Sequence, residues 1–448
     1  MTKFKKIKLL INDIGINGEG VGKNDGYTVF VDNALIGEEI ETSLFQENKK
    51  FARGLLKKIL KRSKNRISPK CIYFEKCGGC QLMHMSYEDQ LKFKENKLKN
   101  ALEYIGAIKD IKIENIEASP KIFNYRNKIQ LPIRNVQNTL KIGLFEKFSN
   151  KIVDINGCHI HSKLGEEIFQ KVKKIIKDVS IDGFCPRTKN GFLRHLLIKT
   201  AENTEEAQII LITNGKTHSE LKNLSERIFN SDKKIRSVIQ NVNTRDDNVI
   251  LSNKFYLLEG SFYIIEKLLE KSFKISPSSF FQINTEQAKN IYKKALEIAE
   301  IGKDEIVLDV YSGVGMFSIF ASSFAKEVYG VECVLDAVKN ARENAEINNL
   351  KNVTFYHDLA EDFIQNFDKN FDIIFLNPPR SGCSKPLLEK LLLKKPKKII
   401  YLSCDVATIS RDLKILKDTY SIDFIKPFDM FPNTYHVETL VKLPLIEK

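Results

Sequence analysis

The feature that most constrains the fold of this chain is an alternation of short apolar runs with helical segments from about residue 285 onward. The runs read "EIVLDVYSG", "EVYGVE", "VTFYHD", "FDIIFLNPP" and "KKIIYLS". Strands that alternate with helices are typical of a parallel sheet covered by helices on both faces. We therefore predict an α/β fold with a doubly wound parallel sheet, and we expect ligands at the carboxyl ends of its strands.

The chain has 448 residues, which is too long for one compact core, and we predict further domains ahead of this sheet. Residues 1–62 contain alternating runs such as "YTVFV" between glycines. They predict a small β-barrel, either of the kind that binds oligonucleotides or a β-module without a ligand. Residues 63–270 mix strand and helix patterns and predict a central α+β domain. The doubly wound domain occupies residues 271–448.

The charge of the chain favours a polyanionic partner. The net charge is +14, and the stretch "KKFARGLLKKILKRSKNRISPK" contains basic residues and no acidic one. Such a run is often only a solvated face, but its interleaved apolar residues favour nucleic acid. With 42% hydrophobic residues and no apolar run long enough for a bilayer, we expect a cytoplasmic, monomeric protein without a membrane partner.

A tight turn follows the first strand of the doubly wound domain, in "VLDVYSGVGMFSIF". Gly313 and Gly315 there let the backbone approach a ligand at the start of a helix. The turn is not a dinucleotide G-x-G-x-x-G, because Ser318 stands at the last position. It is similar to the D-x-x-x-G-x-G turn, beginning at Asp309, of S-adenosylmethionine-dependent methyltransferases. The next strand ends in Glu332, whose carboxylate can accept both hydroxyl protons of a ribose.

Two further strands of the sheet end in candidate site residues. Asn377 begins "NPPRSG", and the Arg380 that follows the prolines argues against the methyltransferases that act on amino groups. Cys404 ends the next strand; it is either a buried strand cap or a nucleophile, and the helix after it would favour the thiolate. Glu438 precedes a late apolar run and is either an ordinary surface residue or the base that such a cysteine needs.

A cluster of cysteines lies in the central domain. Cys71, Cys77 and Cys80 follow a C-x5-C-x2-C spacing, and Cys158 comes later in "DINGCHIH". Disulfides are not expected in a cytoplasmic chain, so the cluster indicates a metal site. Four thiolates suit an iron–sulfur cluster or zinc, and two histidines are alternatives to the fourth cysteine: His159 and His161.

Together these motifs resemble the RNA uracil-5-methyltransferase family, and most closely its 23S ribosomal RNA members with a TRAM domain and an iron–sulfur cluster. Further matching pieces are "YRNKIQLPI", "LRHL", "FFQIN", "SCDVATISRDL" and "DMFPNTYHVE". The resemblance implies a 4Fe-4S cluster on Cys71, Cys77, Cys80 and Cys158. It also implies Cys404 as nucleophile and Glu438 as base. The implied residues around S-adenosylmethionine and the uracil are Gln282, Tyr311, Gly313, Glu332, Asp358 and Asn377.

This chain departs from the family pattern at two positions, with Asn377 in place of aspartate and Asp405 in place of asparagine. An aspartate beside the cysteine would oppose thiolate formation. Our leading hypothesis is methylation of carbon 5 of uridine in 23S ribosomal RNA. The alternatives are the same chemistry on transfer RNA and a non-catalytic RNA-binding or ribosome-assembly factor. A cytosine-5 enzyme is disfavoured, since Pro379 is followed by Arg380 rather than by a cysteine.

Overall fold

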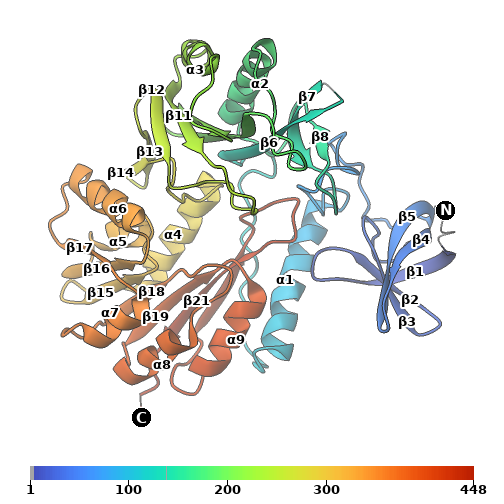
Figure 1. The fold of residues 1–448 in the computed structure, drawn as a ribbon. Helices are drawn as coiled ribbons and strands as arrows, with labels where there is room; N and C mark the ends of the chain where they lie inside the picture. The colour runs from blue at the N-terminus through green and yellow to red at the C-terminus, as the bar shows by residue number, and fades with distance from the viewer. Residues whose placement is uncertain (1–4, 138, 448) are drawn as a thin grey trace.

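The computed structural model of the protein describes residues 5–137 and 139–447. Three parts follow one another along the chain (Figure 1): an N-terminal barrel in blue, a middle sheet in green and a C-terminal α/β part in orange and red. The helix α1 (Tyr87–Tyr104) stands between the barrel and the C-terminal part. None of the helices within the described ranges combines the length and the apolar character that a membrane crossing needs.

The N-terminal strands close into a barrel in the order β1-β2-β3-β5-β4. They are β1 (Lys6–Ile14), β2 (Gly20–Asn24), β3 (Tyr27–Val31), β4 (Glu39–Glu47) and β5 (Phe51–Lys61). Their alternating residues fill a small interior that includes Ile11, Val29 and Ile40, all fully buried. The predicted barrel is confirmed. The strand β5 belongs to the basic stretch and turns Lys57 and Lys58 to solvent.

The middle sheet has the strand order β12-β11-β10-β9-β6-β7-β8. Its strands are β6 (Lys128–Val136), β7 (Thr139–Phe145), β8 (Ile152–Asp154), β9 (Leu193–Ala201), β10 (Glu206–Thr213), β11 (Ile235–Val242) and β12 (Phe255–Gly260). The helices α2 (Lys163–Asp178) and α3 (Leu221–Asn230) share an apolar core with it, so they cover one face. This arrangement agrees with the predicted α+β character.

The C-terminal sheet has the order β17-β16-β15-β18-β19-β21-β20. Its strands are β15 (Ile306–Val310), β16 (Glu327–Glu332), β17 (Val353–His357), β18 (Ile373–Leu376), β19 (Lys398–Ser403), β20 (Phe424–Phe428) and β21 (Glu438–Pro444). Its helices are α4 (Thr285–Ala299), α5 (Met316–Ala321), α6 (Leu335–Ile347), α7 (Ala360–Asn366), α8 (Lys385–Lys394) and α9 (Val406–Leu416). Separate apolar cores cover its two faces, which confirms the doubly wound architecture.

One strand of this sheet departs from the predicted parallel arrangement. The strand β21 runs antiparallel to both of its neighbours, β19 and β20. A loop, residues 429–437, joins β20 to β21 without a crossover helix, and only a crossover can return a chain for parallel pairing. The hairpin connection therefore brings the start of β21 to the edge at which the parallel strands end.

Two elements outside this sheet also pack on it. The helix α1 contributes Leu98 and Leu102 to the same core as Leu413 of α9. The hairpin of β13 (Ile264–Leu268) and β14 (Lys271–Ile275) buries Phe273 in the core of the opposite face. The predicted limit between residues 270 and 271 falls within this hairpin, and the domain limits themselves stay a prediction.

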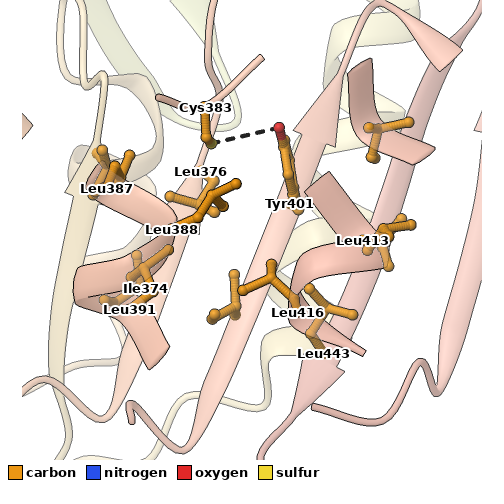
Figure 2. Close-up of a cluster of buried hydrophobic side chains, with 14 of the residues drawn as sticks. Ile374, Leu376, Cys383, Leu387, Leu388, Leu391, Tyr401, Leu413, Leu416 and Leu443 are labelled. Carbon is orange, nitrogen blue, oxygen red and sulfur yellow. Dashed lines mark hydrogen bonds between the residues drawn. The ribbon is translucent and has the colours of Figure 1, made fainter. Parts of the chain in front are cut away.

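Among the apolar side chains of the core beneath β18 and β19, Figure 2 marks one polar contact, between Cys383 and Tyr401. The thiol of Cys383 lies 3.4 Å from the hydroxyl of Tyr401, which donates a 2.6 Å hydrogen bond to Asp412 of α9. The backbone N–H of Cys383 donates to the same carboxylate at 2.9 Å. Burial raises the pKa of the Cys383 thiol to about 12. Cys383 is thus a core residue that ties the loop after Asn377 to α9.

Candidate active site

The turn after β15 has the backbone that a close approach to a ligand requires. Tyr311, Gly313 and Gly315 all have positive φ, at 62°, 55° and 85°. A Cβ added to Gly315 would lie 2.6 Å from the ring of Phe355, so only glycine fits there. A Cβ on Gly313 would meet no atom within 4 Å, which leaves open space in front of this turn.

The carboxylate of Asp309 lies buried beneath the turn. One oxygen accepts hydrogen bonds from the N–H and the hydroxyl of Ser318, at 3.0 and 2.7 Å. Burial raises the pKa of Asp309 to about 7. Its other oxygen and the hydroxyl of Ser312 have no partner among the described residues. Buried polar atoms normally find a partner, so these two are suited to a bound polar ligand or water.

The predicted cofactor residues gather at one edge of the sheet. Glu332, at the end of β16, accepts a 3.1 Å hydrogen bond from the N–H of Gly313. Asp358 follows the adjacent strand β17, and its N–H donates to the carbonyl of Glu332 at 3.2 Å. Asn377 follows β18, which pairs with β15 on the other side. The parallel pairing brings these strand ends together, as predicted.

Gln282 is buried in the loop ahead of α4. The side-chain amide of Asn127, from "YRNKIQLPI", donates to the carbonyl of Gln282 at 2.8 Å. The buried Tyr292 lies between the two halves of the site: burial raises the pKa of its hydroxyl, and the charges of Asp309 and Glu438 add to the effect. Tyr292 is therefore near both the cofactor turn and Glu438. The residues around Tyr292 in the sequence did not predict this position.

Cys404 and Glu438 meet at the same edge. Cys404 follows β19, whose last residue, Ser403, pairs with Thr439, the neighbour of Glu438. Glu438 is only 4% exposed, and no donor in the described ranges hydrogen-bonds to its carboxylate. Burial raises its pKa to about 7 against the opposing charge of Arg380. Glu438 is thus a free buried carboxylate rather than a surface residue.

The thiolate that we expected at Cys404 is not the resting form. Burial raises the pKa of this thiol to about 11, and the charge of Glu438 adds to the rise while Arg380 opposes it. The expected help from the helix is missing because Asp405 caps α9. The Asp405 carboxylate accepts the N–H groups of Ala407 and Thr408, both at 2.9 Å. The amides that would have stabilised a thiolate are thus already bonded to an anion.

Cys404 opens into a cavity of about 590 Å³. Its walls come from three distant parts of the chain: the C-terminal part, α1 and the barrel. The C-terminal part contributes Arg380, Asp405 and His436, and α1 contributes Lys97 and Tyr104. The barrel region contributes Ile14, Ile16 and Ile36. The α1 and barrel residues were not predicted, because nothing local in their sequence marks them.

The four predicted cysteines line one cavity. Cys71, Cys77, Cys80 and Cys158 surround it together with apolar side chains such as Phe74 and Met83. Burial raises the pKa of the Cys80 thiol well above its usual range, and the neighbouring thiols raise it further. Within residues 5–137 and 139–447, no three His, Cys, Asp or Glu side chains are arranged to hold a single metal ion. The iron–sulfur cluster on these four residues stays a prediction.

Comparison with known proteins identifies the family. The family profile described as tRNA (Uracil-5-)-methyltransferase matches residues 86–445, which is most of the chain. The chain belongs to the RNA uracil-5-methyltransferase family. A TRAM domain profile matches residues 2–57, the region of the barrel.

Relatives match the chain over nearly its full length. A Clostridium tetani protein described as an uncharacterized RNA methyltransferase is 39% identical over 98% of this chain and 96% of its own length. A Clostridium acetobutylicum protein with the same description is 38% identical over 100% of this chain and 99% of its own. The barrel and both following parts are therefore shared with these RNA methyltransferases.

A solved structure also matches the whole architecture. It is the Pyrococcus abyssi tRNA (uracil-54, C5)-methyltransferase in complex with S-adenosyl-L-homocysteine. The TM-score is 0.80 with 32% sequence identity, and the match covers 98% of this chain and 100% of that chain. The likeness confirms the class I methyltransferase fold of the C-terminal part.

The structure explains one of the two departures from the family pattern. Asparagine and aspartate are comparably good helix caps, so Asp405 caps α9 as the asparagine expected from the resemblance would. The cost is electrostatic, since the Asp405 charge raises the pKa of Cys404. Nothing in the structure explains the amide at Asn377.

Proposed function

We propose that this protein methylates carbon 5 of uridine in RNA, using S-adenosylmethionine and a covalent Cys404 adduct, with Glu438 as the base. The observation that carries the proposal is the placement of Cys404 opposite a buried, unpartnered Glu438 at the sheet edge that also holds the cofactor turn. A nucleophile and a base so arranged are what methylation of an unactivated pyrimidine carbon requires.

The residues at the turn suit S-adenosylmethionine. Glu332 would accept the ribose hydroxyls, and the open space at Gly313 would admit the cofactor close to the backbone. The unpartnered oxygen of Asp309 and the hydroxyl of Ser312 add polar groups at the same turn. Further residues assigned to this pocket are Gln282, Tyr311, Asp358 and Asn377. When bound, the cofactor supplies an electrophilic methyl group on a sulfonium.

Cys404 makes carbon 5 reactive. Carbon 5 of uracil is a weak nucleophile, but addition of the Cys404 sulfur to carbon 6 turns the ring into an enolate that can take the methyl group. The thiol proton must leave as the sulfur–carbon bond forms, because the pKa of Cys404 is about 11, and it leaves through the cavity to solvent. Glu438 has a pKa of about 7 and is ionised in part near neutral pH, so its carboxylate stays free to accept the later proton.

Glu438 completes the reaction. After methyl transfer, carbon 5 carries both a proton and the methyl group, and the ionised Glu438 carboxylate removes the proton. The electron pair of that carbon–hydrogen bond re-forms the ring double bond and expels Cys404 as a thiolate. Arg380 lowers the pKa of both groups, so it favours the ionised forms on which these steps depend.

The RNA must present an unpaired uridine. A base inside a helix cannot reach Cys404 through the cavity, so an unpaired or flipped-out uridine is required. The sequence motifs favour 23S ribosomal RNA. Transfer RNA is the second candidate, because the Pyrococcus abyssi structure that matches 98% of the chain is of a tRNA uracil-54 enzyme. A non-catalytic RNA-binding role is the alternative of another class.

We also propose a 4Fe-4S cluster on Cys71, Cys77, Cys80 and Cys158. The thiols share one cavity whose other walls include apolar side chains, which suits a cluster. A cluster contains four metal atoms, so its sulfur ligands stand further apart than those around a single zinc ion. When bound it would link the 71–80 segment rigidly to Cys158. The methylation steps do not use it.

The nucleophile is tested by incubating the protein and S-adenosylmethionine with RNA that contains 5-fluorouridine. Fluorine cannot leave carbon 5 as a proton does, so a covalent protein–RNA adduct should accumulate. Cys404→Ala should form none. The proposal fails if the intact protein forms no adduct or if the adduct survives in Cys404→Ala. The non-catalytic alternative predicts that Cys404→Ala keeps the cellular role of the protein.

Two further experiments test the remaining assignments. Mapping 5-methyluridine in ribosomal and transfer RNA from a deletion strain identifies the substrate class, and a lost modification in 23S RNA is expected. A loss confined to transfer RNA would establish the second candidate. Anaerobic purification should give a brown protein with iron and sulfide, whereas stoichiometric zinc would contradict the cluster.

A further inference from the structure

The loop between β20 and β21, residues 429–437, leads directly into Glu438. Its backbone carbonyls are bonded by groups from outside the C-terminal part. Tyr125 donates to the carbonyl of Pro432 at 3.0 Å, and Lys94 of α1 donates to that of Phe431 at 3.1 Å. Lys97 of α1 donates to the carbonyl of Tyr435 at 3.0 Å. The loop therefore depends on Tyr125 and on α1 for its shape.

Asn433 is the most extensively bonded residue of this loop. Its carbonyl accepts the N–H groups of Gln81 and Leu82, at 3.0 and 2.9 Å, just after Cys80. Its N–H donates to the side chain of Gln90 in α1 at 2.9 Å, and its amide donates to the carbonyl of Ile122 at 3.0 Å. The buried Asn433 thus joins the loop to three segments that precede the middle sheet: residues 81–82, α1 and Ile122.

The backbone of Asn433 adds a second constraint. Its φ is 67°, in the left-handed region that asparagine and glycine tolerate better than other residues. It is 2% exposed, so its amide could not exchange the bond to Ile122 for one to water. A buried amide without its partner is unfavourable, and the loop would have to rearrange to avoid leaving it unpaired.

We propose that Asn433 is a positioning residue for Glu438, and that through it the segment after Cys80 sets the geometry of proton removal from carbon 5. This inference rests on the proposed function. The strand pairing of Phe428 with Glu438 fixes one side of Glu438. The other side is the five-residue stretch from Asn433 to Val437, and it carries Tyr435 and His436 into the cavity beside Cys404.

The role of Asn433 is specific to one step. Addition of Cys404 and methyl transfer need the nucleophile and the cofactor turn, and neither contacts Asn433. Removal of the carbon 5 proton needs the Glu438 carboxylate within hydrogen-bond reach, and an error of ~1 Å in such a geometry can cost ~100-fold in rate. Release of Asn433 should therefore slow proton removal and spare methyl transfer.

The test follows both events on one RNA sample. RNA from a deletion strain is labelled with tritium at carbon 5 of uridine, and the S-adenosylmethionine carries carbon-14 in its methyl group. Wild-type protein should release one tritium for each methyl group transferred. Asn433→Gly, which keeps the left-handed backbone, should transfer the first methyl group within about twofold of the wild-type rate. Its tritium release should fall at least about tenfold, and a methylated covalent adduct should accumulate.

Asn349→Gly is the matched control. Asn349 is exposed and has a φ of 54°, and it lies between α6 and β17, away from the loop. It should behave as wild type. Asn433→Asp is the second variant for the case that Asn433→Gly does not fold. It keeps the size of the side chain but replaces the donor to Ile122 by an oxygen, and it should show a defect of the same kind.

The outcomes separate this inference from the proposed function. An equal fall of methyl transfer and tritium release in both Asn433 variants would overturn the positioning role, since a purely structural residue would affect both. Unchanged tritium release would also overturn it. If wild-type protein transferred no methyl group to carbon 5, the proposed function would fail, and this inference with it.

Discussion

Cys404 and Glu438 lie opposite each other where β19 and β21 pair, and apart from burial the Glu438 charge does most to raise the pKa of the Cys404 thiol. The strand pairing brings the two side chains close enough for the charge of Glu438 to act on the Cys404 thiol. The Glu438 charge favours the protonated form of the thiol, and the charge of Arg380 lowers the pKa of both groups.

Glu438→Gln should lower the pKa of Cys404, because it removes a negative charge beside the thiol. Alkylation of Cys404 by iodoacetamide at pH 9, followed by mass spectrometry of its peptide, should become roughly three- to tenfold faster. Glu389→Gln, which changes an exposed carboxylate on α8, is the control and should leave the rate unchanged. An unchanged or slower alkylation in Glu438→Gln would show that the two groups do not interact.

Asp405→Asn should separate the two effects of Asp405. Asparagine can accept the same N–H bonds, so the cap of α9 should persist and the stability should change by less than about 0.5 kcal/mol. Loss of the charge should lower the pKa of Cys404 and speed its alkylation. Asp405→Ala should lose the cap as well and destabilise the protein by about 1 kcal/mol, measured by urea denaturation. Equal stability of the two variants would contradict the cap.

The stability of the protein should depend on the ionisation of Glu438. Its pKa is raised from 4.5 to about 7 in the folded protein, so folding favours the protonated form. Its favourable contribution is complete below pH 4.5 and is lost as pH rises through about 7. Glu438→Gln should therefore be more stable than wild type at pH 8, by up to about 3 kcal/mol, and about equal at pH 4. A pH-independent difference would contradict the raised pKa.

The basic strand β5 should contribute to RNA affinity through phosphate contacts. Replacement of Lys57, Lys58 and Lys61 by glutamine should weaken binding and reduce the slope of log K against log salt by up to about 2–3 units. These side chains are exposed, so folding should not change. The matched control replaces exposed lysines at the C-terminal end of the fold: Lys385, Lys394 and Lys395. An equal reduction of the salt-dependence slope in both triple variants would show that RNA affinity depends on net charge alone and not on the position of the lysines.

Local pattern explains why much of the site was predictable. Asp309, Glu332, Asn377 and Cys404 each lie within one residue of the end of a strand, and strand ends can be located from apolar runs alone. Parallel pairing then places such ends at one edge whatever the details of the packing. Glu438 was found only because a cysteine needs a base. Its own surroundings in the sequence resemble those of a surface residue.

The sequence by itself determined the doubly wound sheet, the cofactor turn and the family, because these depend on periodicity and on residues close together in the chain. Only the tertiary structure decided the chemical state of the site. The pKa of Cys404 is raised by burial and by Glu438, and the helix amides expected to lower it are bonded to Asp405. The cavity walls from the barrel and the bonds of Asn433 join residues hundreds of positions apart. Solvation and long-range contacts set these properties, and neither is encoded in a local stretch of sequence.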